Sequence, residues 1–466
     1  MTQLIDNRGL AMTVASQTVV DNFESALSQM LTYSGDSVGT IDKAIAEDPE
    51  FVMGHCLRAH AGGVMVDAAF CDQVRESVAH AEALAGKAND RERKHIAAAR
   101  KWLDGNFNQA AELLESVLVD YPRDTLALLI AHLGDFYRGD AHNLRDRVAR
   151  VLPQYSEDDA EYGYVLGMYA FGLEECNEYS IAEETGRKAV EMNAADVWAT
   201  HAVAHVMEMQ GRQDDGINWY ESRVSDWSSD SGFAVHNWWH LALFYLDLYR
   251  TDKVLEIYDN TIFDGIVALE MLDASALLWR LHLMGIDTGN RWQVLSDKWA
   301  ETIEKAGYYC FNDVHAILAF VGSGRLDLAD RMVSQLRCSA SNTNDSGGMI
   351  RNVGLPIGEA IVAFGKGDYG VCTDLLCKIR YIANQFGGSH AQRDFIPQTL
   401  IESAARAGRL NQARSLLSER AARKPTSPHI WQKTASVLEQ LQCVDEAQRA
   451  RRRAESLLAS SRMSAD

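Results

Sequence analysis

The sequence contains few of the residues that interrupt regular structure. Its 466 residues include only seven prolines, and few stretches are rich in serine or glycine. Such a composition argues against long linkers and extensive disorder, and an apolar content of 47% supports a well-buried structure. We expect only residues 1–20 and the stretch after about Leu458 to be loose.

Excess positive charge, a membrane segment and an export signal are lacking as well. The formal net charge is −20, which disfavours nucleic-acid binding because phosphate contacts require clustered Lys and Arg. No apolar stretch approaches the roughly 18 residues of a membrane span. The amino terminus shows no charged-then-apolar signal sequence. We therefore expect a cytoplasmic protein with no nucleic-acid and no membrane partner.

Motifs for several kinds of chemistry are also absent. There is no P-loop and no G-x-G-x-x-G, so no nucleotide cofactor is predicted. No serine lies in a G-x-S-x-G setting. The eight cysteines form no C-x-x-C pair, which is typical of reduced thiols in a core.

A short punctuation mark recurs along the chain instead. It consists of Gly, any residue, an apolar or aromatic residue, and Ala three positions further on, and GNFNQA at 105–110 is the clearest copy. Related or looser copies begin at Gly139, Asn177, Gly211, Tyr249, Gly285, Gly324, Gly367, Gly408 and Gln442. Successive marks lie 34 to 43 residues apart, with helical patterning on both sides. This spacing is the signature of tetratricopeptide (TPR) helix pairs.

Stacked helix pairs form a curved solenoid with a long concave surface. We predict an all-α fold, a TPR-like helical-repeat solenoid (superhelix) of about ten to eleven helix pairs, with no strands. Residues 1–90 are expected to form a helical N-terminal cap, 91–460 the solenoid and 461–466 a loose tail. The polar, Gly-rich residues 339–350 are predicted to be the longest loop.

Five histidines share one face of the first helices in the central pairs. They are His201, His205, His236, His240 and His315. At about 100° per residue they fall within a sector about 120° wide, together with Glu208. This sector avoids the positions that pack a TPR first helix against its neighbours, so it should point into the concave groove. A single helical histidine is usually a satisfied core or surface residue, but two consecutive i,i+4 pairs indicate a shared site.

Two chemistries fit these histidines. His201, His205, His236 and His240 could hold a divalent transition metal such as zinc, copper, nickel or iron, with Glu208 or an aspartate completing the shell. The H-x-x-x-H spacing alone is a weak metal motif. Neutral imidazoles could equally perform acid–base catalysis near pH 7 without a metal.

Two polar segments precede other first helices. In FNDVH (311–315), Asn312 and Asp313 suit a helix cap as well as catalysis. In GGSHAQRD (387–394), Arg393 could hold a carboxylate or phosphate, whereas Asp394 could simply cap a helix. On the helix of His236, Trp239 is expected to face the groove as an apolar wall.

The same segments make the chain similar to the tetratricopeptide repeat protein 38 family. The matching segments are FVMGH (51–55), GNF (105–107), HAVAHVMEM (201–209), HNWWHLAL (236–243), FNDVH (311–315), VGLP (353–356) and GGSHAQRD (387–394). They occur in order over nearly the whole chain. The resemblance implies a helical-repeat fold and no particular activity. It marks as functional positions His201, His205, Glu208, His236, His240, Asn312, Asp313, His315, Gln392, Arg393 and Asp394, but not His390.

The sequence favours an enzyme over a scaffold by a narrow margin. The enzyme would be a hydrolase or lyase acting on a small anionic organic substrate, since no redox cofactor motif is present. Its catalytic residues would be His201, His205, His236, His240, His315 and Asp313. Its substrate-binding residues would be Arg393, Trp239, Glu208, Asn312, Asp394 and Gln392. The alternative is a TPR scaffold that binds a peptide or protein partner in its concave groove.

Overall fold

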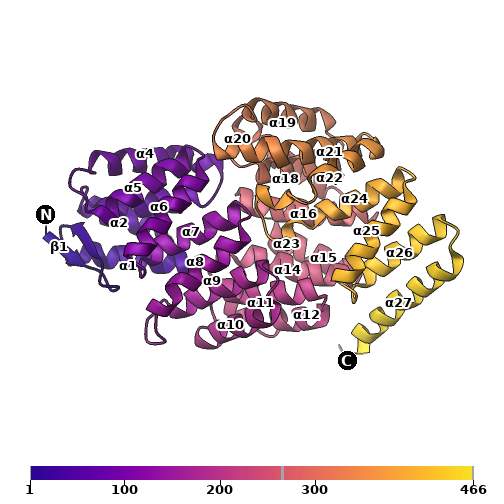
Figure 1. Cartoon of the computed structure of the whole chain (residues 1–466), viewed down its shortest axis with the longest axis horizontal. Coiled ribbons are helices and arrows are strands. Elements are labelled where there is room, and N and C mark those ends of the chain that lie inside the picture. The colour runs from indigo at the N-terminus through magenta and orange to yellow at the C-terminus, as the bar shows by residue number, and fades with distance from the viewer. Residues whose placement is uncertain (1, 264–266, 464–466) are drawn as a thin grey trace.

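The computed structural model describes residues 2–263 and 267–463, and these residues are almost entirely helical (Figure 1). The N-terminal half contains α1 (Gln17–Thr32), α2 (Ser37–Glu47), α3 (Val52–Gly63), α4 (Cys71–Ala83), α5 (Asp90–Leu103), α6 (Phe107–Asp120), α7 (Thr125–Tyr137), α8 (Ala141–Val151), α9 (Tyr162–Glu175), α10 (Tyr179–Met192), α11 (Val197–Gln210), α12 (Gln213–Glu221), α13 (Val224–Trp227), α14 (Ala234–Asp247) and α15 (Thr251–Ile257). The all-α solenoid predicted from the repeats is confirmed.

The C-terminal half continues the array. It contains α16 (Ala268–Leu283), α17 (Arg291–Ala300), α18 (Cys310–Gly322), α19 (Leu326–Ser339), α20 (Asp345–Met349), α21 (Leu355–Gly365), α22 (Tyr369–Ile379), α23 (His390–Arg393), α24 (Phe395–Arg406), α25 (Leu410–Arg423), α26 (Pro428–Gln440) and α27 (Val444–Met463). Short 3-10 or π-helical turns lie at 68–70, 152–154, 258–262, 303–305, 350–354 and 383–386. No helix among the described residues is both long and apolar enough to cross a bilayer.

The ten punctuation marks end the first helices of the pairs. Every one of these marks adopts a left-handed backbone, with φ between 57° and 82°. A left-handed residue after the last helical turn lets its own N–H cap the free carbonyls and reverses the chain. Asn177, Tyr249 and Gln442 do so despite their side chains. Each mark in the sequence therefore corresponds to a left-handed turn that ends a first helix.

A β-hairpin at the amino terminus was not predicted. Strands β1 (Thr2–Ile5) and β2 (Ala11–Val14) pair in antiparallel register. The Asp6 carboxylate accepts hydrogen bonds from the backbone N–H groups of Arg8 and Leu10 and shapes the turn. The Thr13 N–H donates to Glu92 Oε1 at 2.7 Å, which docks the hairpin on α5. The predictions of no strands and of a loose segment at 1–20 are wrong for this reason.

Two other segments are more helical than predicted. Residues 339–350 are not a long loop, because α19 extends to Ser339 and α20 follows at Asp345. Asn344 caps α20 by accepting from the N–H of Gly347 at 3.0 Å. Helix α27 continues to Met463, so it includes residues 461–463 of the predicted tail. The remaining residues, 464–466, lie outside the described part of the chain.

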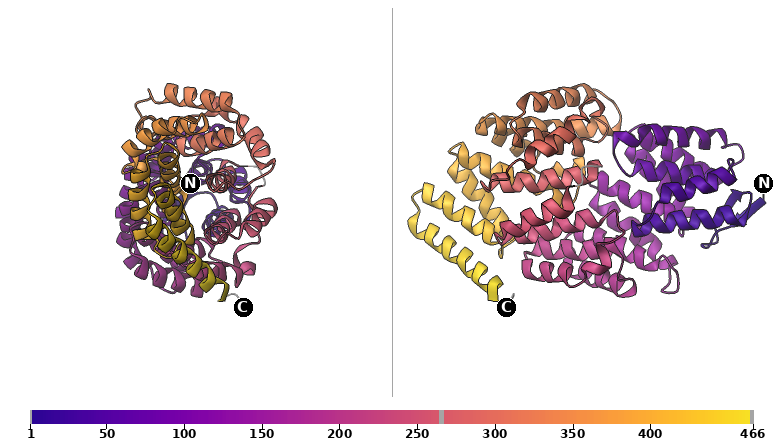
Figure 2. Two further views of the ribbon diagram at one scale, coloured as in Figure 1. Left: turned by 90° about the vertical axis from the view of Figure 1, so that its right-hand side faces the viewer. Right: turned by 180° about the vertical axis from the view of Figure 1, so that it is seen from behind.

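The C-terminal half folds back onto the turns of the N-terminal half. Figure 2 (left) shows, along the long axis, how the helices surround a common centre. The Ser346 N–H donates to the carbonyl of Gly105 at 3.1 Å, and Asn384 Nδ2 donates to the carbonyl of Gly139, also at 3.1 Å. The Thr426 hydroxyl donates to the carbonyl of Gly211 at 2.7 Å. Three repeat marks are thus bonded to the second half, which lies over part of the inner surface of the first.

Candidate functional site

Four of the five predicted histidines meet between two neighbouring first helices. Helix α11 carries His201 and His205, and helix α14 carries His236 and His240. Each pair is spaced i,i+4, so both rings project from one face of their helix. Ligand-capable atoms of the four rings all lie within 4.8 Å of one another. We call these four residues the histidine cluster.

Carboxylates lie behind three of the four rings. His236 Nδ1 is 2.7 Å from Asp273 Oδ2, and His240 Nδ1 is 2.9 Å from Glu208 Oε2. His205 Nδ1 lies 3.4 Å from Glu174 Oε2. An ionised carboxylate only accepts, so Nδ1 of His236 and of His240 carries the proton. In the neutral rings Nε2 is then a free lone pair, and these two Nε2 atoms face each other at 3.3 Å.

Three rings of the cluster are buried, and His236 is largely buried, with 13% of its side chain exposed. Burial, followed by the neighbouring imidazoles, holds the pKa of His201 and of His240 well below its usual value. Among the described residues, neither ring nitrogen of His201 or His205 has a hydrogen-bond partner. A buried polar atom without a partner costs roughly 1–3 kcal/mol. The arrangement therefore leaves both ring nitrogens of His201 and the Nε2 of His205 with unused bonding capacity, while His205 Nδ1 lies 3.4 Å from Glu174 Oε2.

Aromatic side chains close the cluster. The Trp239 ring stacks on His236 with centroids 5.2 Å apart and planes 15° apart. Phe171 and Trp198 pack against His201. Trp239 is fully buried, so the prediction that it forms a groove wall is wrong. Packing of the second half, including the guanidinium of Arg280 over its ring, covers it.

His315 does not join the other four histidines. Helix α16 packs between α14 and α18 and separates the helix of His315 from the cluster. The His315 Nδ1 donates to the carbonyl of Phe311 at 2.7 Å, and its ring packs against Phe311 and Phe395. The same intervening helix supplies Asp273 to His236. Side chains at equivalent positions of two first helices therefore come close together only when those two helices are neighbours.

Asn312 and Asp313 line a separate cavity of about 210 Å³ at the start of α18. Asn312 Nδ2 donates to the carbonyl of Val66 at 2.9 Å. Asp313 Oδ2 accepts from the N–H of Gly307 at 3.0 Å. Burial raises the pKa of Asp313 to about 7. Asn312 and Asp313 line this cavity away from the histidine cluster, so the predicted catalytic role of Asp313 beside those histidines is not supported.

The substitution Asp313→Asn is expected to stabilise the protein above neutral pH. Between the ordinary aspartate pKa of 3.8 and a folded-state pKa of about 7, the native state keeps a proton that the unfolded chain has lost. The free energy of unfolding of the original protein therefore falls as pH rises through this window. We expect a gain on the order of 2 kcal/mol at alkaline pH and little gain near the lower end of the window.

Denaturant unfolding at both ends of this pH window tests the expectation. The exposed Asp158→Asn provides the control and should leave stability unchanged at either pH. An equal stability of Asp313→Asn and the original protein at alkaline pH would contradict the argument.

The segment at 387–394 lies against the end of α9. Gln392 forms a capping box with Ser389, and Arg393 pairs with Glu175 at 3.1 Å. The His390 N–H donates to Glu175 Oε1 at 2.7 Å. Glu174, Glu175 and His390 form a second group of potential metal ligands. Sequence analysis missed all three of them.

A signal for Glu174 was present in the sequence. Glu174 lies three residues before the mark at Asn177, as Glu208 lies three residues before Gly211. Both carboxylates reach the histidine cluster in the structure. His205 and His390 lower the pKa of Glu174, although burial opposes this. The position three residues before the mark therefore identifies two of the three carboxylates, but not Asp273.

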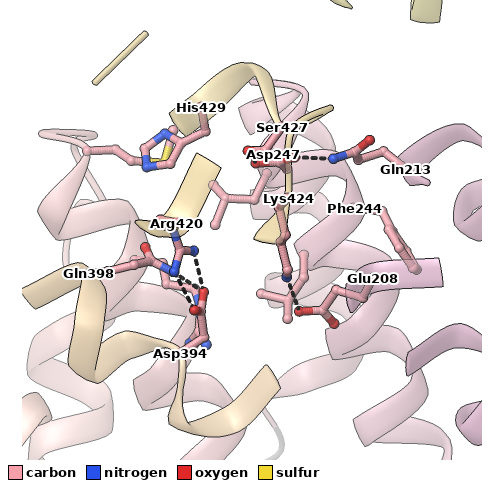
Figure 3. Close-up of a pocket in the computed structure, with 14 residues that line it drawn as sticks. Glu208, Gln213, Phe244, Asp247, Asp394, Gln398, Arg420, Lys424, Ser427 and His429 are labelled. Atoms are coloured by element: carbon pink, nitrogen blue, oxygen red, sulfur yellow. Dashed lines mark hydrogen bonds and ion pairs between the residues drawn. The ribbon is translucent and has the colours of Figure 1, made fainter. Parts of the chain in front are cut away.

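Two cavities lie beside the cluster and share Asp394, Arg420 and Lys424. The smaller, of about 60 Å³, is shown in Figure 3, where Arg420 points at Asp394 and Lys424 at Glu208. Glu208 connects this cavity to the cluster, because its Oε1 lies 3.6 Å from Lys424 Nζ while its Oε2 bonds His240. Neither cavity is lined by any of the four histidines.

The larger cavity, of about 280 Å³, is rich in positive charge. Two carboxylates, Asp394 and Glu419, line it. Its five cationic side chains are Arg380, Arg393, Arg420, Arg423 and Lys424. We call this cavity the basic groove.

Comparisons with known proteins find helical-repeat structures of low similarity to this chain. No family model matches it. Human IFIT1 bound to m7Gppp-AAAA is 14% identical, with 96% of each chain covered and a TM-score of 0.42. Yeast Tom70 is 13% identical, with 96% of each chain covered and a TM-score of 0.34. Cut9–Hcn1 of the APC/C is 10% identical, covering 94% of this chain and 93% of that one, with a TM-score of 0.36.

These three structures are TPR-repeat helical proteins. The more specific resemblance to the tetratricopeptide repeat protein 38 family is not confirmed by them. At such identities and TM-scores the comparisons carry no argument about what this chain binds.

Proposed function

We propose that this chain is a binding scaffold that holds an acidic segment of a protein partner in the basic groove. The observation that carries the proposal is the sign of the local charge. The whole chain has a net charge of −20, yet the groove is lined by five cationic side chains and two carboxylates. Arg380, Arg393, Arg420 and Lys424 already pair with carboxylates. Arg423 is therefore the cation of the groove that is left to attract a partner of complementary charge.

The apolar part of the lining of the groove suits a peptide. Helical-repeat proteins use the concave surface of their array for binding. Ile396, Leu400 and Leu416 supply apolar surface between the cations. Arg423 is exposed on the last turn of α25 and forms no ion pair with the described residues. It is therefore available to a carboxylate of the partner.

The acid–base interpretation of the histidine cluster has less support. A catalytic site needs room for a substrate beside its proton-transfer groups. The four rings are enclosed by aromatic side chains and line neither adjacent cavity. This geometry therefore does not support a hydrolase or lyase function.

Binding of a short fluorescent peptide of alternating glutamate and leucine tests the proposal. The substitution Arg423→Glu should weaken the affinity at least about 10-fold, because it replaces an attraction by a repulsion. The matched control is Arg452→Glu, which reverses an exposed arginine on α27 away from the groove and should change affinity little. Binding should also weaken as ionic strength rises.

Three outcomes would overturn the proposal. The first is that the acidic peptide does not bind better than a lysine–leucine peptide of the same length. The second is that Arg452→Glu weakens binding as much as Arg423→Glu. The third is that a single-stranded RNA binds the groove in preference to the acidic peptide.

A further inference from the structure

We propose that the histidine cluster is a closed binding site for one divalent transition-metal ion, with zinc as the best-matched ion. The inference goes beyond the proposed peptide groove and does not depend on it. It rests on ligand type, ligand spacing, the carboxylates behind the rings, and unpartnered ring nitrogens at the centre.

The ligand type selects the class of metal. Neutral imidazoles suit zinc, copper, nickel and iron, whereas magnesium and calcium prefer oxygen ligands. The cluster offers four imidazoles, and no carboxylate is needed to complete a tetrahedral shell. Protein sites with four protein ligands and no open position are typical of structural zinc.

The spacing of the rings agrees with a shared ion. Zinc–nitrogen bonds of about 2.0–2.1 Å in a tetrahedral shell place the ligand atoms about 3.3–3.4 Å apart. The Nε2 atoms of His236 and His240 lie 3.3 Å apart. The ring centroids of His201 and His205 are 4.3 Å apart, and those of His205 and His240 are 4.4 Å apart. Small side-chain rotations would therefore complete the shell.

The carboxylates fix the histidine tautomer that metal binding requires. Metal-bound histidines usually donate their second ring N–H to a carboxylate or carbonyl, which fixes the tautomer and orients the ring. Asp273 and Glu208 do so for His236 and His240. Glu174 is placed for the same role behind His205. These three negative charges also offset the charge of a buried dication.

The nitrogens at the centre have no other use in the structure. Two lone pairs facing each other at 3.3 Å repel unless a proton or a cation lies between them. Both ring nitrogens of His201 and the Nε2 of His205 are buried without a hydrogen-bond partner in the described part of the chain. An ion at the centre would engage one nitrogen of each ring.

Metal content and coordination of the full chain test the proposal. The protein is purified without a histidine tag, stripped with a chelator and titrated with Zn²⁺ and with Co²⁺. We expect one ion per chain, a visible Co²⁺ spectrum of the tetrahedral type, and a higher melting temperature with Zn²⁺ present. His205→Gln and His240→Gln should each lose this stoichiometric binding.

A matched control comes from another buried histidine. His132 on α7 is also buried, and neither of its ring nitrogens has a hydrogen-bond partner among the described residues. His132→Gln should keep one ion per chain. Arg423→Glu in the basic groove should keep it as well, which separates this test from that of the proposed function.

Asp273→Asn keeps all four ligands and provides a second variant if the glutamine variants fail to fold. It should weaken metal affinity about 10–100-fold, as loss of a carboxylate behind a ligating histidine commonly does. The proposal is overturned if the original chain binds no Zn²⁺ or Co²⁺ in stoichiometric amounts. It is also overturned if the Co²⁺ spectrum is octahedral, or if His132→Gln reduces binding as much as His205→Gln.

Discussion

Replacing Gly139 with alanine is expected to destabilise the fold by about 3 kcal/mol or more. An added Cβ would lie 1.8 Å from the carbonyl oxygen of Asn384. That atom belongs to the backbone of the second half, so it cannot move aside as a flexible side chain could. The residue also has a φ of +64°, which disfavours any side chain. Denaturant unfolding followed by circular dichroism measures the loss.

Gly367→Ala is the matched control for this substitution. Gly367 occupies the equivalent mark of another pair, with a φ of +82° and no atom within 4 Å of an added Cβ. It should cost only about 1 kcal/mol, the penalty for a side chain in the left-handed region. Equal losses at 139 and 367 would show that packing of the two halves adds nothing at this turn.

Replacing Asp394 with alanine is expected to cost about 3 kcal/mol. Its carboxylate forms a two-point ion pair with Arg420, with Nη2 2.6 Å from Oδ2, and also accepts from Gln398 (Figure 3). Both partners are mostly buried, so removal of Asp394 would leave the guanidinium without its counter-ion. The double variant Asp394→Ala, Arg420→Ala should recover part of the loss, because it leaves no unpaired charge.

The same ion pair predicts a dependence on pH. Although burial opposes ionisation, Arg420 holds the pKa of Asp394 well below its usual value. Its stabilisation is therefore present at neutral pH and is lost as pH falls below the ordinary aspartate range. Unfolding of the single variant should accordingly show a weaker loss of stability on acidification. Stabilities that fall in parallel, or additive losses in the double variant, would contradict a net stabilising pair.

Local features of this fold could be predicted from the sequence. The marks were found because a left-handed residue must follow each first helix, and all ten adopt that conformation. The histidine cluster was found because i,i+4 spacing on neighbouring first helices places side chains on facing surfaces. His315 was misplaced because its helix belongs to a pair that is not adjacent to α14.

Contacts between the two halves could not be predicted in this way. The bonds from Ser346 and Asn384 to Gly105 and Gly139 join residues more than 200 positions apart in sequence. Nothing in a repeat pattern specifies how tightly the superhelix curls. Burial of Trp239 and the approach of His390 to Glu175 both follow from that curl. The hairpin at β1 and β2 was missed because its strands are short and its stabilising partner, Glu92, lies on α5.

Because the chain is synthesised from its amino terminus, the second half can dock onto the first only after the histidine cluster has been made. Residues 201–240 leave the ribosome well before residues 390–424, which later lie against α9 and α11. During that interval the imidazoles remain open to the surroundings. Once the last repeats have docked against Glu175 and Glu208, a species held among the imidazoles would depart more slowly unless those repeats lift away. Its residence time would then be governed by a rare opening of the finished protein rather than by the strength of its own bonds.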